Sequence, residues 1–144
     1  MTNRPFIDAF LKSLEDGSFV GHEDHWYAPD CVQVEFPNVL VPNGAVRHLL
    51  DIAAAARRGA EIVEHQSYTI ENWLENGNQI AFEATFRASF RIDLPALSRG
   101  RQMTARFGVF IQVENSRILR HHTYDCFDPV VRFADADGSD SAAS

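Results

Sequence analysis

The sequence lacks the features that mark several large classes of protein. It contains no run rich in lysine or arginine, and its 13 basic residues are outnumbered by 20 acidic ones, so the electrostatic footprint of a nucleic-acid-binding protein is missing. No apolar stretch approaches the roughly 18 residues that a membrane span needs. No G-x-S-x-G motif, phosphate-binding loop or dinucleotide fingerprint occurs, so serine-nucleophile chemistry and nucleotide cofactors have no local support. We expect no nucleic-acid partner, no membrane partner and no cofactor.

Cysteine and metal-ligand clusters are also scarce. The two cysteines, Cys31 and Cys126, each lie inside an expected strand, and the N-terminus lacks the basic start and apolar run of a signal peptide. We therefore expect a cytoplasmic protein, in which such a cysteine pair is usually reduced. His22 and His25 are spaced i, i+3 on a short expected helix, but no cysteine or third histidine stands near them, so we expect no metal site.

What is present is the material for one ordinary domain. The chain has 144 residues, 45% of them hydrophobic, which suffices to bury a substantial core. Its last residues, "ADADGSDSAAS", are small and polar, and burial of such residues cannot offset the entropy lost on ordering. We expect one domain over residues 1–133 and a disordered acidic, Ser/Ala-rich tail over residues 134–144.

Three helices are expected before residue 60. Residues 5–17 begin with a proline, carry apolar side chains at i, i+3 and i+4, and end in a glycine, as a helix does. A serine can cap a second short helix over residues 18–27, which Pro29 terminates. The third helix is expected to begin near Asn43 and to end at residues 57–59, where two arginines and a glycine suit a helix C-terminus.

From residue 62 the hydrophobic period changes from 3.6 to 2, which indicates strands. Asn-Gly within "ENGNQ" predicts a hairpin that joins strands at about 62–75 and 78–92. Further strands are expected at about 103–113 and 117–128. The second strand of the hairpin has one apolar face, formed by Phe82, Ala84, Phe86, Ala88 and Phe90. The pattern predicts an α+β fold with one covered face of the sheet.

Polar side chains interrupt this alternation in the opening and closing strands. The opening strand, residues 31–36, carries Cys31, Gln33 and Glu35 on one face, and the strand at 62–75 is mixed. The closing strand places polar groups on both faces: Ile118, Arg120, His122, Tyr124 and Cys126 on one, and Leu119, His121, Thr123, Asp125 and Phe127 on the other. Buried polar groups without partners cost about 1–3 kcal/mol each, so these strands indicate a wet pocket or a ligand. An edge strand exposed on both faces, or a dimer surface, is the alternative.

The order of these elements resembles the SnoaL-like families of the nuclear transport factor 2-like superfamily. The likeness covers about residues 5–130 and rests on "WYAPD", a short strand ending in Phe-Pro, Gly44 and the closing "RILRHHTYDCFDP". It implies three N-terminal helices packed in the concave face of a strongly curved, mainly antiparallel sheet, as a cone with an internal cavity. Members include polyketide cyclases, ketosteroid isomerase, limonene epoxide hydrolase and dehydratases.

The resemblance also implies roles for single residues. The eighth residue after Tyr27, where ketosteroid isomerase has its general-base aspartate, is Glu35. The isomerase's oxyanion-hole tyrosine and protonated aspartate correspond to Phe10 and about Gly108, which cannot support an enolate, so a steroid isomerase is disfavoured. The Asp-Arg-Asp trio of limonene epoxide hydrolase is incomplete. Asp125 is the nearest match to the closing-strand aspartate of the SnoaL-type cyclases.

These resemblances give a candidate site. Glu35 is expected to be the base, Tyr124 and either His122 or His121 the electrophilic donors, and Asp125 a second acid or an orienting group. The remaining expected substrate-binding residues are aromatic or imidazole side chains: Trp26, Tyr27, Phe82, Phe86, Phe107, His65 and His121.

We predict a cofactor-independent small-molecule enzyme, an isomerase, cyclase or dehydratase that acts on an apolar cyclic or polyketide-like carbonyl compound. The alternative is a non-catalytic ligand-binding or dimerisation module of the same fold. A raised carboxyl pKa would favour catalysis over the alternative. A homodimer formed through the outer face of the sheet is expected in either case.

Overall fold

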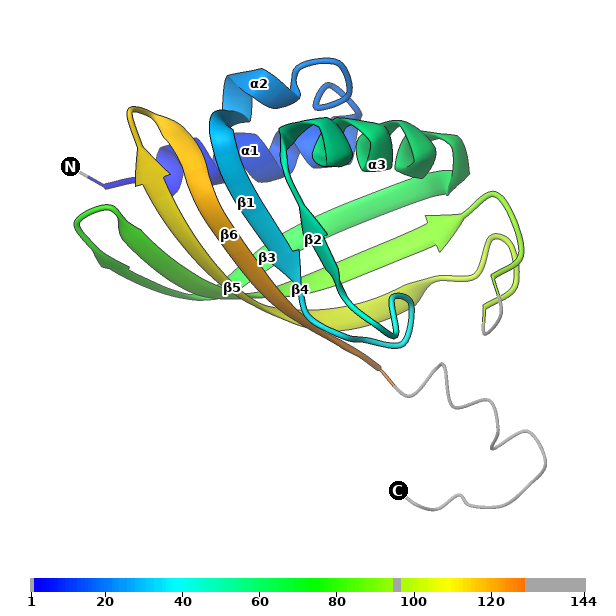
Figure 1. The fold of residues 1–144 in the computed structure, drawn as a ribbon. Coiled ribbons are helices and arrows are strands. Elements are labelled where there is room, and N and C mark those ends of the chain that lie inside the picture. The colour runs from blue at the N-terminus through cyan, green and yellow to red at the C-terminus, as the bar shows by residue number, and fades with distance from the viewer. Residues whose placement is uncertain (1, 95–96, 129–144) are drawn as a thin grey trace.

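The computed structural model describes residues 2–94 and 97–128. It has three helices, α1 (Arg4–Asp16), α2 (Glu23–Trp26) and α3 (Leu49–Ile62), and six strands (Figure 1). The strands are β1 (Tyr27–Glu35), β2 (Ala45–Arg47), β3 (Val63–Asn76), β4 (Gln79–Phe90), β5 (Met103–Glu114) and β6 (Arg117–Phe127). The α+β class is confirmed. The tail expected at residues 134–144 lies outside the described residues.

The six strands form one open, mixed sheet in the order β2-β1-β6-β5-β4-β3. The first and last long strands, β1 and β6, are parallel neighbours, and the other pairs are antiparallel. The predicted hairpin is confirmed: Asn76 pairs with Gln79 around Gly77. The parallel pair matters for the site, because it brings the polar faces of the opening and closing strands together.

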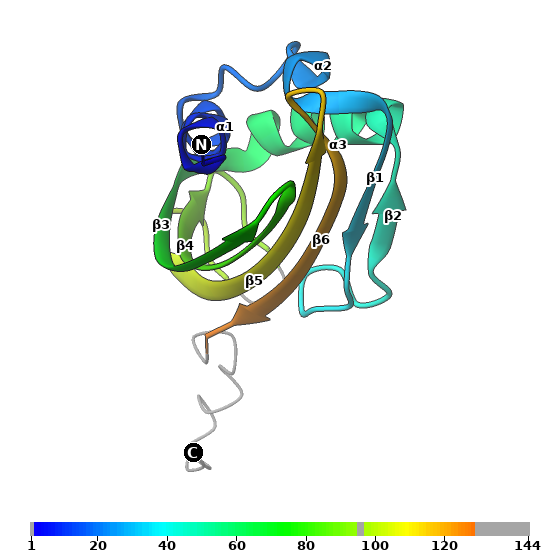
Figure 2. The ribbon, with the colours of Figure 1, turned by 90° about the vertical axis from the view of Figure 1, so that its left-hand side faces the viewer.

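The strands curve beneath α1 and α3, which cross above them (Figure 2). α1 begins with a proline in its first turn and ends at Gly17, whose φ of 83° is a left-handed conformation that glycine adopts readily. Its buried residues, Ile7 and Phe10 among them, belong to one core with Phe82 of β4 and Val109 of β5. The apolar stripe of α1 is therefore held by the middle of the sheet.

Two helix boundaries differ from those expected. The second helix covers only Glu23–Trp26 rather than residues 18–27, and β1 begins directly after it. The third helix begins at Leu49, not near Asn43, because Ala45–Arg47 form the edge strand β2. Gly44 makes this turn possible: its φ is +68°, and an added Cβ would lie 2.7 Å from the carbonyl oxygen of Glu35.

A register shift on β6 changes which side chains face the core. The shift lies between the pairs Gln112–Arg120 and Val113–Ile118. Ile118 is consequently fully buried, although strict alternation would place it on the face of Tyr124. Beyond the shift, His121, Thr123 and Asp125 share one face, as the alternation predicted, and this face is the one that lines the interior.

Candidate functional site

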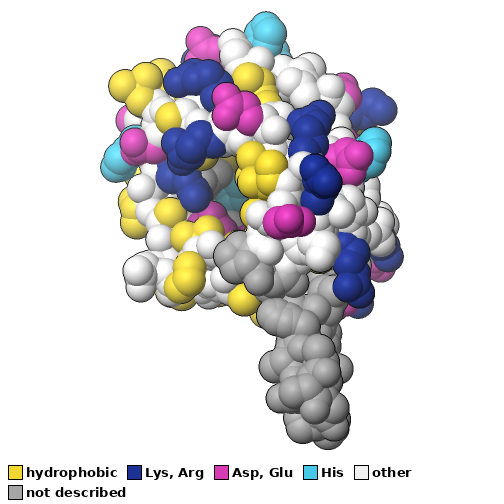
Figure 3. All heavy atoms as spheres, turned by 90° about the vertical axis from the view of Figure 1, so that its right-hand side faces the viewer, with side chains coloured by type: hydrophobic (Ala, Val, Ile, Leu, Met, Phe, Trp, Pro, Cys, Tyr) yellow, Lys and Arg dark blue, Asp and Glu magenta, His cyan; other side chains and the backbone are white. Residues whose placement is uncertain are grey.

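A cavity of about 590 Å³ lies between the helices and the covered face of the sheet. Apolar side chains from α1 and the middle strands form part of its wall: Phe10, Leu11, Phe82, Phe107, Val109 and Ile111. The rest includes Ile52, Ala55 and Ala56 of α3 and polar side chains from α1, β1, β2, β3 and β6. Figure 3 shows a hollow on this side of the molecule, with hydrophobic, basic and acidic side chains around its rim. A concave wall that combines apolar surface with convergent polar groups is typical of small-molecule sites.

Tyr27, which is buried, and His121, which is half-buried, form a hydrogen-bonded pair in the cavity wall. Oη of Tyr27 lies 2.8 Å from Nδ1 of His121, and the two rings are nearly parallel, 9° apart. The amide Nε2 of Gln33 donates to the same hydroxyl at 3.2 Å. Burial raises the pKa of Tyr27 above its ordinary value and lowers the pKa of His121 to about 4, the latter with a contribution from the nearby charge of His122. Both rings are therefore neutral at pH 7.

Arg47 and Glu35 form an ion pair beside this group. Nη1 of Arg47 donates to Oε1 of Glu35 and to Oε1 of Gln33, each at 3.0 Å. The other Glu35 oxygen accepts from Nδ2 of Asn38 at 2.9 Å. These contacts occur because β2 pairs with β1 in a register that sets Arg47 opposite Gln33. The short strand thus delivers a cation to the cavity wall.

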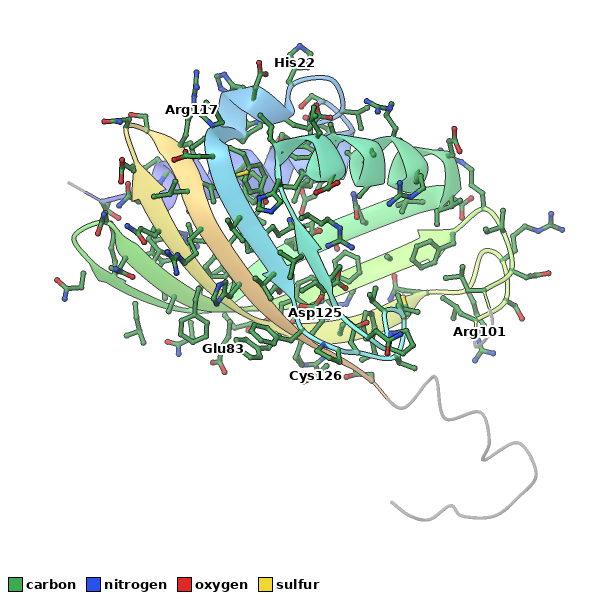
Figure 4. The ribbon with its side chains drawn as sticks, in the orientation of Figure 1. His22, Glu83, Arg101, Arg117, Asp125 and Cys126 are labelled. Carbon is green, nitrogen blue, oxygen red and sulfur yellow. The ribbon has the colours of Figure 1, made fainter. Side chains whose placement is uncertain are left out.

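Asp125 lies farther along β6 and has a different environment. It is labelled in Figure 4 near the C-terminal end of the strand, and its neighbour Cys126 is exposed on the opposite face. Burial raises the pKa of Asp125 to about 6, and the charge of Glu35 acts in the same direction. The hydroxyl of Thr123 opposes this shift by donating to Oδ1 at 2.5 Å. The carboxyl is therefore able to change its protonation state near neutral pH.

Tyr68 of β3 faces the same region from the other side of the cavity. Its ring lies against Phe86 and Phe107, with centroids 5.1 and 6.1 Å away. Burial raises its pKa, and the negative charges of Asp125 and Glu35 contribute. No residue within the described ranges makes a hydrogen bond with its hydroxyl. Tyr68 therefore has a free donor at neutral pH.

The structure places seven of the predicted site residues around the cavity: Tyr27, Glu35, His65, Phe82, Phe107, His121 and Asp125. Two predicted catalytic residues, His122 and Tyr124, lie elsewhere. Alternation along β6 turns them to the outer face, where Tyr124 is 45% exposed and stacks on Phe36 at 4.3 Å. His122 contacts the edge of the same phenylalanine. From the sequence, either His122 or His121 was expected in the site, and it is His121 that lines the cavity.

Two of the predicted substrate-binding aromatics do not line the cavity either. Trp26 packs against Phe6 and Phe10, with ring centroids 5.5 and 5.9 Å away, so it belongs to the core beside α1. Phe86 belongs to a second core cluster and stacks on Phe107 at 4.9 Å. Neither residue type nor, for Phe86, a place on the apolar face of its strand distinguishes a cavity wall from the layer behind it.

Four polar residues that line the cavity and interact with predicted site residues were not proposed from the sequence: Gln33, Arg47, Tyr68 and Thr123. Three of them lie on polar faces that the broken alternation had already marked. Arg47 carried no such signal, because residues 45–47 fit the apolar period of the helix expected there. A turn at Pro42-Asn43-Gly44 was the available indication that the helix starts later.

The structure also bears on metals, disulfides and membranes. Within residues 2–94 and 97–128, no group of three or more His, Cys, Asp or Glu side chains could hold a metal ion. Cys31 is buried and Cys126 exposed, and both are free thiols. In the same part of the chain, no helix has the length and apolar character needed to cross a membrane. The cytoplasmic location stays a prediction.

Comparison with known families identifies the chain. The model of the SnoaL-like domain matches residues 7–121. The chain belongs to the SnoaL-like family. No curated protein gives a significant match to this SnoaL-like chain.

Solved structures with this SnoaL-like fold include three informative neighbours. AclR from Streptomyces galilaeus, a proposed hydroxylase, has a TM-score of 0.73 at 10% identity and covers 99% of this chain and 89% of its own. IdmH from Streptomyces antibioticus, a proposed polyketide cyclase, has a TM-score of 0.70 at 19% identity. The match covers 95% of this chain and 99% of the IdmH chain. An LEH-like epoxide hydrolase of M. tuberculosis has a TM-score of 0.63 at 20% identity. The match covers 90% of this chain and 85% of the hydrolase chain. At these identities the likeness shows the fold.

Proposed function

We propose that this SnoaL-like protein is a cofactor-independent small-molecule enzyme of the isomerase, cyclase or dehydratase type, which transfers protons on an apolar cyclic carbonyl compound. The observation that carries the proposal is the position of Asp125, a carboxyl in the wall of a largely apolar cavity with a pKa raised to about 6 by burial. A carboxyl with a pKa near the working pH can accept a proton and return it within one catalytic cycle.

In this proposal Asp125 transfers the proton, and Glu35 does not. Both oxygens of Glu35 are engaged, one by Arg47 and one by Asn38, so Glu35 anchors the guanidinium. Oδ1 of Asp125 accepts from Thr123, whereas Oδ2 has no hydrogen-bond partner in the described part of the chain. A free carboxylate oxygen is what removal of a proton from a substrate requires.

Tyr68 supplies the donor that an enolate needs. Its hydroxyl has no hydrogen-bond partner among the described side chains, and the charges of Asp125 and Glu35 act on it. A neutral O–H donor near the developing negative oxygen stabilises it most where water is excluded. Tyr68 therefore takes the part that Phe10 and Gly108 cannot take.

The structural neighbours support the same class of function. They include a proposed polyketide cyclase, a proposed hydroxylase and an epoxide hydrolase. They differ in reaction, so the reaction type of this chain is inferred from its own residues.

Proton exchange tests the proposal without knowledge of the natural product. The probe is 2-tetralone, an apolar bicyclic ketone whose protons next to the carbonyl are replaced by deuterium in D2O. We expect the protein to accelerate this replacement, observed by proton NMR, and Asp125→Asn to slow it roughly 100-fold. Glu83→Gln, the same change at an exposed residue of β4, serves as the control and should leave the rate unchanged.

The outcome also separates the two functions considered. If 2-tetralone and related cyclic ketones bind but their exchange matches that in buffer, the protein is a ligand-binding module and the enzymatic proposal fails. If exchange is fast in Asp125→Asn as well, Asp125 is not the proton-transferring group.

We also propose a homodimer through the outer face of the sheet. Exposed aromatic side chains gather there: Tyr124 stacks on Phe36, and Phe110, 54% exposed, meets Tyr124 edge to face at 6.0 Å. An exposed apolar cluster on a sheet face is typical of an interaction surface. Sedimentation equilibrium should show a dimer that Phe110→Asp dissociates. The control Leu50→Asp, at an 83% exposed residue of α3, should remain dimeric; a monomeric parent protein would refute the proposal.

A further inference from the structure

The hydrogen bonds between Arg47 and His121 have a fixed direction. A guanidinium can only donate hydrogen bonds, and Nη1 of Arg47 donates to Oε1 of Gln33 at 3.0 Å. If the Gln33 amide were rotated by 180°, its NH2 group would face the Arg47 guanidinium, and two hydrogen-bond donors would meet without an acceptor. Its NH2 group must therefore face Tyr27, and it donates to the Tyr27 hydroxyl at 3.2 Å.

The Tyr27 hydroxyl then has one available hydrogen-bond acceptor. Tyr27 is 1% exposed, so water is not an alternative partner. Its oxygen already accepts from Gln33, and within the described ranges the one other polar atom bonded to it is Nδ1 of His121, at 2.8 Å. A buried hydroxyl that donates to nothing costs free energy. Tyr27 therefore donates to Nδ1, which must carry no hydrogen.

A neutral imidazole without a hydrogen on Nδ1 carries it on Nε2. Burial keeps the pKa of His121 near 4, so the ring is neutral at pH 7. His121 lines the cavity, and no described side chain or backbone group bonds its Nε2. The Nε2–H group is thus left for a molecule inside the cavity.

We infer that Gln33, Tyr27 and Arg47 are positioning residues that hold His121 as its Nε2–H tautomer, so that His121 donates a hydrogen bond to a ligand oxygen. His121 and Asp125 are four residues apart on one strand, roughly 13 Å between Cα atoms. One carbonyl group cannot serve both. The ligand class is therefore an apolar carbonyl compound with a second acceptor oxygen, such as an ether or another carbonyl, remote from the reacting one. This last step rests on the proposed function; the assignment of the tautomer does not.

The tautomer can be read directly by nitrogen NMR of the histidine rings in the full protein without ligand at pH 8, with the His121 signals assigned from their loss in His121→Asn. We expect the proton on Nε2. In Gln33→Glu, a carboxylate replaces the amide donor, Tyr27 turns its proton to residue 33, and the His121 proton should move to Nδ1. Gln112→Glu, the same change on β5, should not alter His121. A proton on Nδ1 in the parent protein, or on Nε2 in Gln33→Glu, would overturn the inference.

Tyr27→Phe provides a second variant should Gln33→Glu fail to fold. It removes the donor to Nδ1, so we expect the single Nε2–H form to give way to a mixture of tautomers. An unchanged Nε2–H form in this variant would mean that Tyr27 does not position His121.

Two matched ketones test the ligand class. 6-Methoxy-2-tetralone carries an ether oxygen remote from the carbonyl, and 6-ethyl-2-tetralone has nearly the same shape without it. We expect the methoxy compound to bind about tenfold more tightly, as one hydrogen bond allows, and Gln33→Glu to remove the preference. Equal binding, or no binding of either ketone, refutes the ligand class. Absence of proton exchange refutes the proposed function and leaves the tautomer result standing.

Discussion

The hydroxyl of Thr123 donates a hydrogen bond of 2.5 Å to Oδ1 of Asp125, two residues along the same face of β6. This bond favours the charged carboxylate and so holds the pKa of Asp125 below the value that burial would set. The proton-transferring group of the proposed enzyme is thus tuned by its nearest neighbour on the strand.

Thr123→Val keeps the shape of the side chain and removes this bond. We expect the pKa of Asp125 to rise above 6 by about one unit, since the charged form loses a hydrogen bond. Carboxyl carbon NMR measured against pH would show it, and the pH profile of ketone exchange should move in the same direction. Thr69→Val, at an exposed residue of β3, is the control. A pKa that stays at 6 would mean that the bond does not form in solution.

The two perturbed groups of β6 should affect stability against pH with opposite signs. The pKa of Asp125 rises from 3.8 to about 6 on folding, so its contribution is present in acid and is lost as pH rises through 6. The pKa of His121 falls from 6.5 to about 4, so its contribution is present above 6.5 and is lost as pH falls toward 4. Between pH 4 and 6 the two slopes, each about 1.4 kcal/mol per pH unit, oppose each other.

Single variants should separate the contributions of Asp125 and His121 to the pH dependence of the free energy of unfolding, measured by urea unfolding at several pH values. Asp125→Asn removes a buried charge and should raise the free energy of unfolding at pH 7.5 by up to about 3 kcal/mol, with a steeper loss toward pH 4. His121→Asn should instead grow more stable, relative to the parent protein, as the pH falls from 6.5 to 4. Parallel curves for both variants would contradict the assigned shifts.

A pair of tyrosine variants tests the placement of the donors. Tyr68→Phe removes a hydroxyl from the cavity and should slow ketone exchange at least tenfold with little change in stability. Tyr124→Phe makes the same change on the outer face, where the residue is 45% exposed, and should leave the exchange rate unchanged. The reverse result would restore the role that the sequence suggested for Tyr124.

Gly44 is expected to tolerate replacement less well than Gly21. In Gly44→Ala the new Cβ would lie 2.7 Å from the backbone oxygen of Glu35, in addition to the strain of a φ of +68°. Gly21 has a φ of +86° but nothing within 4 Å, so Gly21→Ala carries the strain alone, about 1–2 kcal/mol. Thermal unfolding should rank Gly44→Ala as the more destabilised, and equal losses would show that the turn yields to the added carbon.

Most of the architecture could be predicted because its signals are local. The Asn76-Gly77 turn, the alternation in β4 and β5, and the proline and glycine that bound α1 each determine an element within a few residues. Alternation along β6 could group His121 with Thr123 and Asp125, but which of the two faces is covered could not be predicted from the strand itself. The burial of Ile118 could not be predicted either, because it depends on a register shift against β5 that the sequence of β6 does not encode.

The site was predictable where polar residues broke an apolar pattern, as at Glu35, His121 and Asp125. It was not predictable where the distance of a side chain from the cavity determines its role, as at Phe86, which lies behind the cavity wall. Arg47 was missed because a strand of three residues cannot be distinguished from the first turn of a helix by its period. The proposed division of roles between Glu35 and Asp125 depends on the contacts of Glu35 with Arg47 and Asn38, which form only in the folded chain.

The parallel pairing of β1 with β6 has a consequence for how the protein is made. A ribosome releases β1 well before β6, its partner on one edge, because β2, α3 and β3 to β5 lie between them in the chain. Until β6 emerges, the hydrogen-bonding groups on that edge of Val32–Glu35 lack His121 and its neighbours as partners, so the growing chain carries an open strand edge while the intervening elements are made. Contacts this distant in sequence form slowly. The cavity wall that joins Gln33 to His121 should therefore be among the last parts to fold, and a nascent chain stalled before residue 117 should be a substrate for chaperones.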